Sequence, residues 1–470
     1  MRLAKNLFCF ILLSFIFFTY SITNSGCAQI GAPTGGPKDT IPPVLVSAVP
    51  AMKNTNFSGK LITLTFDEYI NVDNIQSNLL VSPYPKKNPT VTYKLKTVTI
   101  KLSDTLLANT TYSLNFGNAI KDVDEGNIFR NFTYVFSTGN TIDSLKLSGK
   151  VLVAETGRPD STLLVFLYRN ANDSSVQQKK PTYIAKVNGD GTFNFYHLPA
   201  GIFRIYALKD DDGSKTYNSK YEEFAFADTD INTTTYTGKI RLFASAEEKE
   251  EKKKSTTTTS TTKPSKNKDK AVKKFKYSIA TASQDLLNPL EIDFSQQIKD
   301  IDSDKIVLTD TFFHKIKASL TVDSTRKKVF INPKWSDGTD YRLIVDSTAA
   351  TDSTDEHLAK NDTLKFRTKQ VSEYGSILFR FSDIDYAKHP VLLLLQKDVI
   401  VRTIPVKAPE WSDPIFPPGE YELRILYDTN DNGKWDPGNY SEKRQPEKVI
   451  SLDKKLVIKA DWDNEREIQL

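Results

Sequence analysis

The feature that most constrains this chain is a succession of short runs in which apolar or β-branched residues alternate with polar ones. Residues 97–102 (Thr-Val-Thr-Ile-Lys-Leu), 111–116 and 131–136 follow this pattern, and turn-forming residues separate the runs. A period of two places every second side chain on the same face of a β-strand. No amphipathic helical segment longer than two turns follows residue 27. The sequence therefore predicts an all-β protein built from antiparallel β-sandwiches.

The composition agrees with a chain of several folded domains and excludes some classes of function. The 470 residues are 39% hydrophobic and 26% charged, and a chain of this length divides into about three or four domains. The net charge of +5 is small for this size, which argues against a nucleic-acid partner. Two cysteines and four histidines are poor material for a disulfide framework or a Cys/His metal site. Each domain must therefore be stable through its own hydrophobic core.

The first 27 residues predict export. Two basic residues precede an apolar run, residues 7–20, which is shorter than a membrane-spanning helix and typical of a signal peptide. An uncleaved membrane anchor is the alternative. Residues 24–27 (Asn-Ser-Gly-Cys) resemble a bacterial lipobox, in which a peptidase cuts before a cysteine that is then acylated. The resemblance implies a signal peptide over 1–26 and a lipid anchor on Cys27. The protein would then be exported and held at the outer membrane, on its periplasmic face or at the cell surface.

Changes in composition divide the rest of the chain. Residues 27–39 are rich in Gly, Pro and Thr and predict a tether. Residues 246–274 are rich in Lys, Glu and Thr, contain no aromatic residue, and predict a disordered linker. A basic patch for anionic glycans or lipid head groups is the other interpretation of the linker. Strand patterns fill four blocks, which we call A (40–140), B (141–245), A′ (275–370) and B′ (371–470).

Blocks A′ and B′ repeat the pattern of A and B. Residues 61–71 (LITLTFDEYIN) correspond to residues 290–299 (LEIDFSQQIK). The Pro-x-Gly turn and strand that end in Asp210 correspond to the turn and strand that end in Asp428, and in both the aspartate stands nine positions after the glycine. The predicted fold class is therefore a tandem array of four β-sandwiches in the order A–B–linker–A′–B′.

Short motifs in A and B carry family resemblances. They are residues 39–43 (Asp-Thr-Ile-Pro-Pro), 64–68 (Leu-Thr-Phe-Asp-Glu) and 136–139 (Phe-Ser-Thr-Gly) in A, and residues 190–193 (Asp-Gly-Thr-Phe) and 198–201 (Leu-Pro-Ala-Gly) in B. Block A resembles the bacterial Ig-like domain named after S-layer proteins, and A′ resembles a more divergent copy. Block B resembles the transthyretin-like or carboxypeptidase-regulatory-like sandwich. The segment that starts at Cys27 is similar to the N-termini of Ig-like lipoproteins of the Bacteroidota. These resemblances imply an envelope lipoprotein and supply no catalytic residues.

The sharpest candidate for a site follows the repeated strand of B′. Oxygen-bearing side chains stand at relative positions 1, 3, 5 and 9 and are those of Asp428, Asn430, Asn432 and Asp436. Gly433 stands at position 6, as in a Ca²⁺-binding loop whose alternate oxygens converge on one cation. The closing glutamate expected at position 12 is replaced by Asn439. A plain Asx/Gly turn is the alternative, and structural calcium is the one cofactor that the sequence suggests.

A second candidate is a recurring tripeptide, Asp followed by Ser or Thr and then by an apolar residue or Thr. It resembles the acceptor motif for O-glycosylation in the Bacteroidota, and attached sugars would be bulky and confined to the surface. The acceptors would be Thr40, Thr105, Ser144, Ser161, Ser324, Ser347, Ser353 and Thr363. Turns that are rich in Ser and Thr are the alternative explanation.

The sequence contains no Gly-x-Ser-x-Gly elbow, no His-Glu-x-x-His and no P-loop. We therefore expect no enzymatic activity. The expected function is that of a structural or interaction module of the envelope, attached to a membrane by its lipid and binding an unidentified protein or glycan partner. The alternative is a carbohydrate-binding or nutrient-capture accessory lipoprotein. Its platform would be an exposed aromatic row that includes Trp335, Trp411, Trp435 and Trp462.

Overall fold

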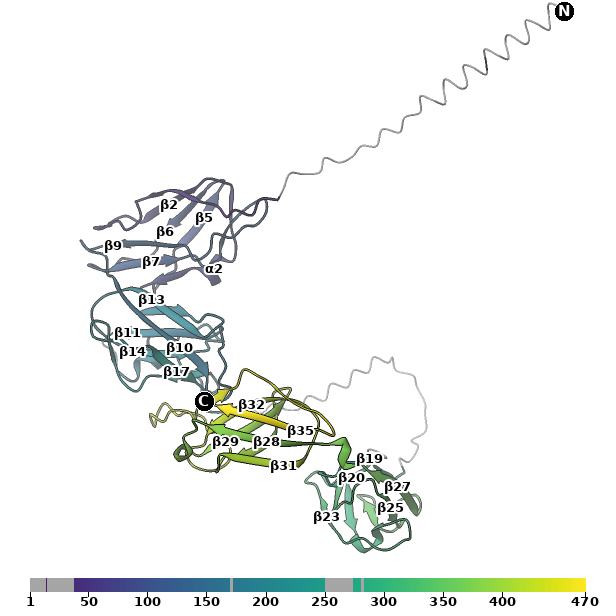
Figure 1. Ribbon diagram of the computed structural model, residues 1–470. Helices are drawn as coiled ribbons and strands as arrows, with labels where there is room; N and C mark the ends of the chain where they lie inside the picture. The colour runs from purple at the N-terminus through teal and green to yellow at the C-terminus, as the bar shows by residue number, and fades with distance from the viewer. Residues whose placement is uncertain (1–13, 15–37, 170–171, 250–273, 280–282) are drawn as a thin grey trace, which may run out of the picture. The chain divides into compact units, whose positions relative to one another are not determined.

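The computed structural model of the protein describes residues 14, 38–169, 172–249, 274–279 and 283–470, and the regular secondary structure of these residues is almost entirely β-strand (Figure 1). Its short helical turns are α2 (Ile75–Asn78), α3 (Ser175–Gln178), η1 (Ser303–Lys305), η2 (Val371–Glu373) and η3 (Tyr386–Lys388). No helix of the described residues is long and apolar enough to cross a membrane. Cys27 and, apart from residue 14, the predicted signal peptide lie outside the described residues, as do nearly all of the tether and linker. The chain divides into two compact units, Met1–Asp143 and Ser144–Leu470.

The first unit holds block A. One sheet has the strand order β1-β2-β6-β5, a second has the order β4-β7-β9, and β3 pairs with β8. All these pairs are antiparallel. The strands are β1 (Leu45–Val49), β2 (Leu61–Phe66), β3 (Ile70–Val72), β4 (Leu80–Ser82), β5 (Thr90–Lys94), β6 (Thr97–Lys101), β7 (Thr111–Asn115), β8 (Ile120–Asp122) and β9 (Thr133–Ser137).

The core of A follows from the alternation in its sequence. Ile62, Leu64 and Phe66 of β2 are buried, whereas the threonines between them are only partly covered. Tyr134 and Phe136 of β9 belong to the same buried cluster. Burial of each such side chain contributes roughly 1.5–3 kcal/mol, so the apolar face of each strand is what holds the sheets of A together.

Block B begins the second unit. A three-stranded sheet has the order β13-β10-β17, in which β10 is antiparallel to β13 and parallel to β17. A five-stranded sheet has the order β12-β11-β14-β15, and β16 also pairs with β14. The strands are β10 (Leu145–Val153), β11 (Leu164–Arg169), β12 (Tyr183–Lys186), β13 (Thr192–Leu198), β14 (Ile202–Leu208), β15 (Phe224–Phe226), β16 (Ile231–Asn232) and β17 (Ile240–Ala244).

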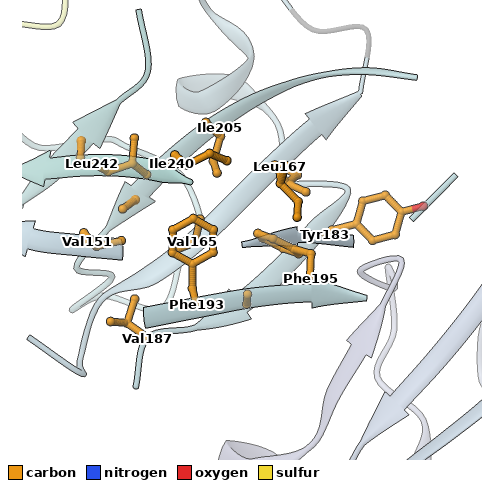
Figure 2. Packing of buried hydrophobic residues seen from close by; sticks show 14 of the residues in the cluster. Val151, Val165, Leu167, Tyr183, Val187, Phe193, Phe195, Ile205, Ile240 and Leu242 are labelled. Atoms are coloured by element: carbon orange, nitrogen blue, oxygen red, sulfur yellow. The ribbon is translucent and has the colours of Figure 1, made fainter. Parts of the chain in front are cut away.

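The two sheets of B enclose one apolar core. Figure 2 shows Val165 and Ile205 from one sheet gathered with Val151 and Phe193 from the other. Gly149 is required where β10 meets β17, because a Cβ there would lie 2.4 Å from the carbonyl oxygen of Ile240. The close parallel pairing of these strands therefore depends on a residue without a side chain.

Block A′ has three sheets, with the orders β18-β20-β24-β23, β19-β27-β25-β22 and β21-β26. Its core cluster includes Ile292, Val329, Leu343 and Phe366. The strands are β18 (Tyr277–Ile279), β19 (Ser283–Gln284), β20 (Leu290–Phe294), β21 (Ile298–Ile301), β22 (Ile306–Thr309), β23 (Ala318–Val322), β24 (Lys328–Pro333), β25 (Asp340–Val345), β26 (Ala350–Asp352) and β27 (Asp362–Thr368).

Block B′ has a three-stranded sheet, β31-β28-β35, and a five-stranded sheet, β30-β29-β32-β33, in which β34 also pairs with β32. Its core cluster includes Phe379, Leu392, Leu423 and Ile425. The strands are β28 (Gly375–Ser382), β29 (Pro390–Gln396), β30 (Val399–Pro405), β31 (Glu410–Phe416), β32 (Gly419–Tyr427), β33 (Val449–Ser451), β34 (Leu456–Ile458) and β35 (Asp463–Gln469).

The strand orders match between the two halves of the chain. Replacing β10 to β17 of B by β28 to β35 reproduces both sheets of B′, including the parallel pair β28–β35. Block A′ repeats A with one added strand, β19, which is parallel to β27. In A an isolated parallel bridge between Asn54 and Phe136 takes its place. The predicted fold class, a tandem all-β array, is confirmed.

Candidate functional site

The four residues of the predicted calcium loop lie together in the structure. Asp428 follows β32 directly and is fully buried, and its carboxylate accepts the N–H groups of Asn432 (3.2 Å) and Gly433 (2.6 Å). The side-chain amides of Asn430 and Asn432 both donate to Oδ2 of Asp436, at 2.6 and 2.7 Å. The spacing in the sequence therefore places all four side chains in one loop.

Hydrogen bonds take the places in this loop that a cation would occupy. Asn430 and Asn432 direct their nitrogens, not their oxygens, toward Asp436, so both amides would have to rotate to become calcium ligands. Among the residues that the structure describes, no three His, Cys, Asp or Glu side chains are grouped closely enough to hold a metal. The loop has suitable residue types without the ligand geometry, and calcium binding stays a prediction.

Glu447 is the residue of this loop that the sequence analysis missed. Its buried carboxylate accepts the N–H and the hydroxyl of Thr429 through Oε1, both at 2.7 Å, and the N–H of Asp436 through Oε2 at 3.1 Å. The chain makes an excursion over residues 437–446 before it returns to the loop, so no motif of fixed spacing includes Glu447. This carboxylate, not the residue at position 12, ties the two ends of the loop together.

In the corresponding loop of B, a lysine side chain supplies the positive charge. Asp210 follows β14 as Asp428 follows β32, and its side chain is also buried. The ammonium group of Lys215 forms an ion pair with this carboxylate, and the Lys215 N–H donates to it at 2.7 Å. Five residues after its own aspartate, B′ has Gly433 where B has this lysine. The negative charge of the buried aspartate is therefore stabilised differently in the two loops. Asp210 pairs with the ammonium group of Lys215, whereas Asp428 accepts backbone N–H groups.

The segment after the calcium loop binds B′ to B through a buried tyrosine. The ring centroid of Tyr440 lies 5.9 Å from that of Tyr206, 5.1 Å from that of Phe224 and 5.2 Å from that of Phe226. Its hydroxyl donates to the carbonyl of Asp173 at 2.8 Å. Burial and the hydroxyl of Tyr206 raise the pKa of Tyr440, which keeps it neutral. Tyr440 is thus an aromatic anchor of B′ within B.

Backbone groups of the same segment are also bound to the end of B. The N–H of Gly438 donates to Oγ of Ser245 at 3.0 Å, and the N–H of Tyr440 donates to Oε1 of Glu247 at 2.8 Å. Both donors are removed from water and both are satisfied, which avoids the penalty for a buried unpaired N–H. The contact is therefore directional as well as apolar.

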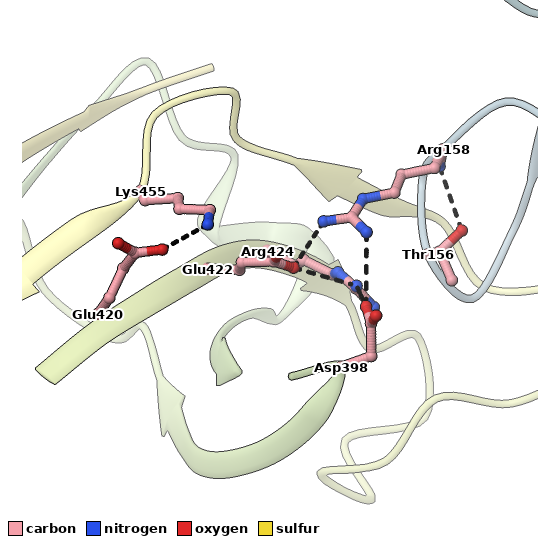
Figure 3. Close-up of polar contacts among 7 residues, drawn as sticks. All are labelled: Thr156, Arg158, Asp398, Glu420, Glu422, Arg424 and Lys455. Carbon is pink, nitrogen blue, oxygen red and sulfur yellow. Dashed lines mark hydrogen bonds and ion pairs between the residues drawn. The ribbon is translucent and has the colours of Figure 1, made fainter. Parts of the chain in front are cut away.

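A second contact between B and B′ lies around Arg158 (Figure 3). The guanidinium group of Arg158 lies 2.5 Å from Glu422 and 3.4 Å from Asp398, both in B′. The preceding residue, Gly157, has φ of +66°, and a Cβ there would lie 2.4 Å from the carbonyl oxygen of Val449. Glycine at this position lets the backbone of B approach β33 of B′.

Seven of the eight predicted glycosylation acceptors are exposed, and Ser347 is half-buried. Four of the motifs are Asp-Ser-Thr and form the same turn, in which the aspartate accepts both the N–H and the hydroxyl of the threonine. These pairs are Asp160–Thr162, Asp323–Thr325, Asp346–Thr348 and Asp352–Thr354. The turn explains the first and third residues of the motif. It assigns no role to the middle serine, and glycosylation there stays a prediction.

The four tryptophans do not form an aromatic row. Trp335, Trp411 and Trp435 are partly buried and pack against three different clusters of buried side chains. The indole N–H of Trp435 donates to the carbonyl of Glu447 at 2.9 Å. Trp462 is 60% exposed. Three of these side chains therefore contribute to folding, and carbohydrate binding stays a prediction that the tryptophans do not support.

The chain is a tandem β-sandwich protein. Two kinds of sandwich alternate along it, A with A′ and B with B′, and B′ is docked on B. Within it, residues 39–138 match the family described as bacterial Ig-like domain. This match confirms the resemblance stated for block A. The transthyretin-like assignment of B and B′ stays a prediction.

Among solved structures, the Bacillus anthracis TIE protein is 11% identical, with 93% of this chain and 76% of that chain covered and a TM-score of 0.17. The N-terminal part of the bacterial S-layer protein SbsC is 16% identical, with coverage of 43% and 44% and a TM-score of 0.16. BcpA, the major pilin subunit of Bacillus cereus, is 11% identical, with coverage of 69% and 99% and a TM-score of 0.17. TM-scores this low describe no shared arrangement of the whole chains. No curated protein matches the sequence.

Proposed function

We propose that the protein is a non-catalytic structural or interaction module of the cell envelope, anchored to the membrane by an acyl chain on Cys27. The observation that carries this proposal is the docking of B′ on B. Sandwiches joined only by linkers move independently unless their interface is well packed. Here a buried tyrosine and satisfied backbone donors join the two blocks. The docked pair forms a stiff support from which loops and strand edges can bind partners.

The anchor rests on the sequence. An apolar segment too short to span a bilayer is followed by the lipobox-like residues 24–27. After cleavage before Cys27, the tether separates the acyl group from the first strand of A. The carbohydrate-binding alternative lacks support from the tryptophans, because only Trp462 is largely exposed.

The experiment that tests the anchor is the substitution Cys27→Ala, followed by separation of membrane and soluble fractions. We expect the unmodified protein in the membrane fraction and the variant in the soluble fraction. The matched control is Cys9→Ala, which lies in the predicted signal peptide and should leave the protein in the membrane fraction. If the unmodified protein retains residues 1–26 by mass spectrometry and carries no acyl group on Cys27, the uncleaved-anchor alternative is correct.

A further inference from the structure

The loop between β22 and β23 of A′ presents two phenylalanines to solvent. Phe312 is 77% exposed and Phe313 is 59% exposed. Of the large apolar side chains whose exposure the structure describes, Phe312 is the most exposed. We call residues 310–315 the aromatic tip. Adjacent apolar side chains that stand out on a folded surface mark sites of interaction.

The aromatic tip is held in one conformation. The carboxylate of Asp310 accepts the N–H groups of Phe312 (2.8 Å) and His314 (2.9 Å), and its other oxygen lies 2.8 Å from Nδ1 of His314. Phe313 has φ of +67°, in the left-handed region that a bulky side chain rarely adopts. Such strain persists only where the surrounding contacts impose it. The fold therefore holds both rings outward instead of letting them collapse onto the sheet.

The corresponding loop of A lacks this feature. Residues 83–89 join β4 to β5 in A as residues 310–317 join β22 to β23 in A′. Their one aromatic side chain, Tyr84, is half-buried. An Ig-like sandwich of this topology therefore forms without an exposed aromatic tip, and the exposure of Phe312 and Phe313 is specific to A′.

A row of basic residues adjoins the aromatic tip. Lys315 lies opposite Thr309, Thr309 lies opposite Arg342, and Arg342 lies opposite Lys365, so the row crosses three strands. Directly opposed residues point to the same face of a sheet. The guanidinium carbon of Arg342 lies 4.3 Å from the ring centroid of Phe313, which joins the basic row to the aromatic tip.

The carboxylates on the same two strands do not neutralise this row. Asp340 of β25 forms an ion pair with Arg367, and Asp362 of β27 forms one with Lys360. Arg342 is paired directly with Lys365 across these two strands. The face beside the aromatic tip is therefore cationic, and the rings of Phe312 and Phe313 are the apolar part of the tip. The carboxylate within the tip, that of Asp310, is engaged by the N–H groups of Phe312 and His314 and by the ring of His314.

We propose that the aromatic tip of A′ inserts into the surface of a bilayer that contains anionic lipids. The two rings would enter the boundary of the acyl chains, and Lys315, Arg342 and Lys365 would contact the phosphates above it. A membrane surface presents these two chemistries in that order, with anionic headgroups over an apolar layer. The charge complementarity of the basic row favours this occupant over an uncharged apolar pocket of another protein. This contact is separate from the lipid anchor and does not need it.

The test uses residues 28–470, which retain every described strand and lack the acylated cysteine. Co-sedimentation is measured with vesicles of phosphatidylglycerol and phosphatidylcholine in equal parts, and with vesicles of phosphatidylcholine alone. We expect binding to the anionic vesicles that weakens in about 0.5 M NaCl, where charges are screened beyond roughly a few ångströms. The paired change Phe312→Ser and Phe313→Asn should weaken binding at least about tenfold. Asparagine is chosen because it adopts positive φ without strain.

Two further variants separate the contributions. Arg342→Gln with Lys365→Gln should weaken binding and reduce its dependence on salt. The matched control is Val399→Ser with Ile400→Ser in the edge strand β30, which removes comparably exposed apolar surface, 64% and 51%. It should bind like the unmodified protein. Circular dichroism checks that each variant is folded.

Three results would overturn the proposal. The first is an unmodified chain that does not sediment with anionic vesicles. The second is binding that the paired phenylalanine change leaves intact. The third comes from a photo-cross-linking residue placed at position 312 of the full chain in cells, if it labels a protein and not lipid. Because the vesicle assay lacks Cys27, its failure is distinct from a failure of the lipid anchor.

Discussion

The hydroxyl groups of Tyr206 in B and Tyr440 in B′ lie 3.1 Å apart inside a buried contact. Tyr206 stands five residues after Gly201, and the corresponding residue of B′, five after Gly419, is Arg424. The duplicated strands β14 and β32 thus carry different buried side chains at one position. The surface of B that contacts Tyr440 therefore differs in sequence from the corresponding surface of B′, so the contact is specific to the pair B and B′.

Removal of the Tyr440 ring should destabilise the docked pair. Tyr440→Ala deletes a buried aromatic side chain, which typically lowers the free energy of unfolding by about 3 kcal/mol. Tyr440→Phe deletes only the hydroxyl, with its hydrogen bonds to the carbonyl of Asp173 and to the hydroxyl of Tyr206, and should lower it by about 1–2 kcal/mol. Urea unfolding measures both, with the partly exposed Tyr386→Ala as the control. A Tyr440→Ala protein as stable as the unmodified one would show that the tyrosine anchor contributes nothing.

Cutting the chain between B and A′ should not separate its halves. Residues 250–273 contain many lysines, so brief trypsin treatment should cut there. We expect the two fragments to elute together in size-exclusion chromatography and to separate on a denaturing gel. The same treatment of Tyr440→Ala should yield fragments that elute apart. Separate elution of the fragments from the unmodified protein would contradict docking in solution.

Calcium binding at the loop after β32 requires the side-chain amides of Asn430 and Asn432 to rotate, and calorimetry tests whether it occurs. Weak calcium sites have Kd values of roughly 10⁻⁴–10⁻³ M, and calcium at ten times such a Kd would raise the free energy of unfolding by about 1.4 kcal/mol. Titration calorimetry of the full chain should show a binding heat that Asp436→Asn removes. Asp212→Asn is the control, because the loop of B has Lys215 beside its buried aspartate. An identical heat from Asp436→Asn would place any bound calcium elsewhere.

Acid should weaken the turn at Asp323 only well below pH 4. The hydroxyl of Thr325 and the N–H groups of Lys328 and Lys327 hold the pKa of Asp323 at about 2, against about 3.9 in an unfolded chain. Since the folded pKa is depressed, the stabilisation is complete above about pH 4 and is lost as the pH falls through about 2. Carbon NMR of the carboxyl group measures this pKa. Asp323→Asn should be less stable than the unmodified protein at pH 7, and the difference should shrink toward pH 2.

How far the sequence predicts this protein depends on the range of the interactions. Strand alternation, the turns at Asp323 and Asp352, and the four polar residues from Asp428 to Asp436 were all predictable, because each depends on residues close together along the chain. The repeated order of the blocks was predictable for the same reason. These local patterns account for the fold class and for the position of the candidate calcium loop.

The remaining features depend on contacts between distant segments. Glu447 enters the candidate calcium loop only because the chain between it and Asp436 turns away to dock on B. Tyr440 looks like an ordinary loop tyrosine in the sequence, and its burial requires the aromatic side chains of β14 and β15. Phe312 and Phe313 would be taken for core residues from their hydrophobicity, but the hydrogen bonds of Asp310 hold them in solvent. Burial and exposure at these positions follow from packing between segments far apart in sequence, which local periodicity does not encode.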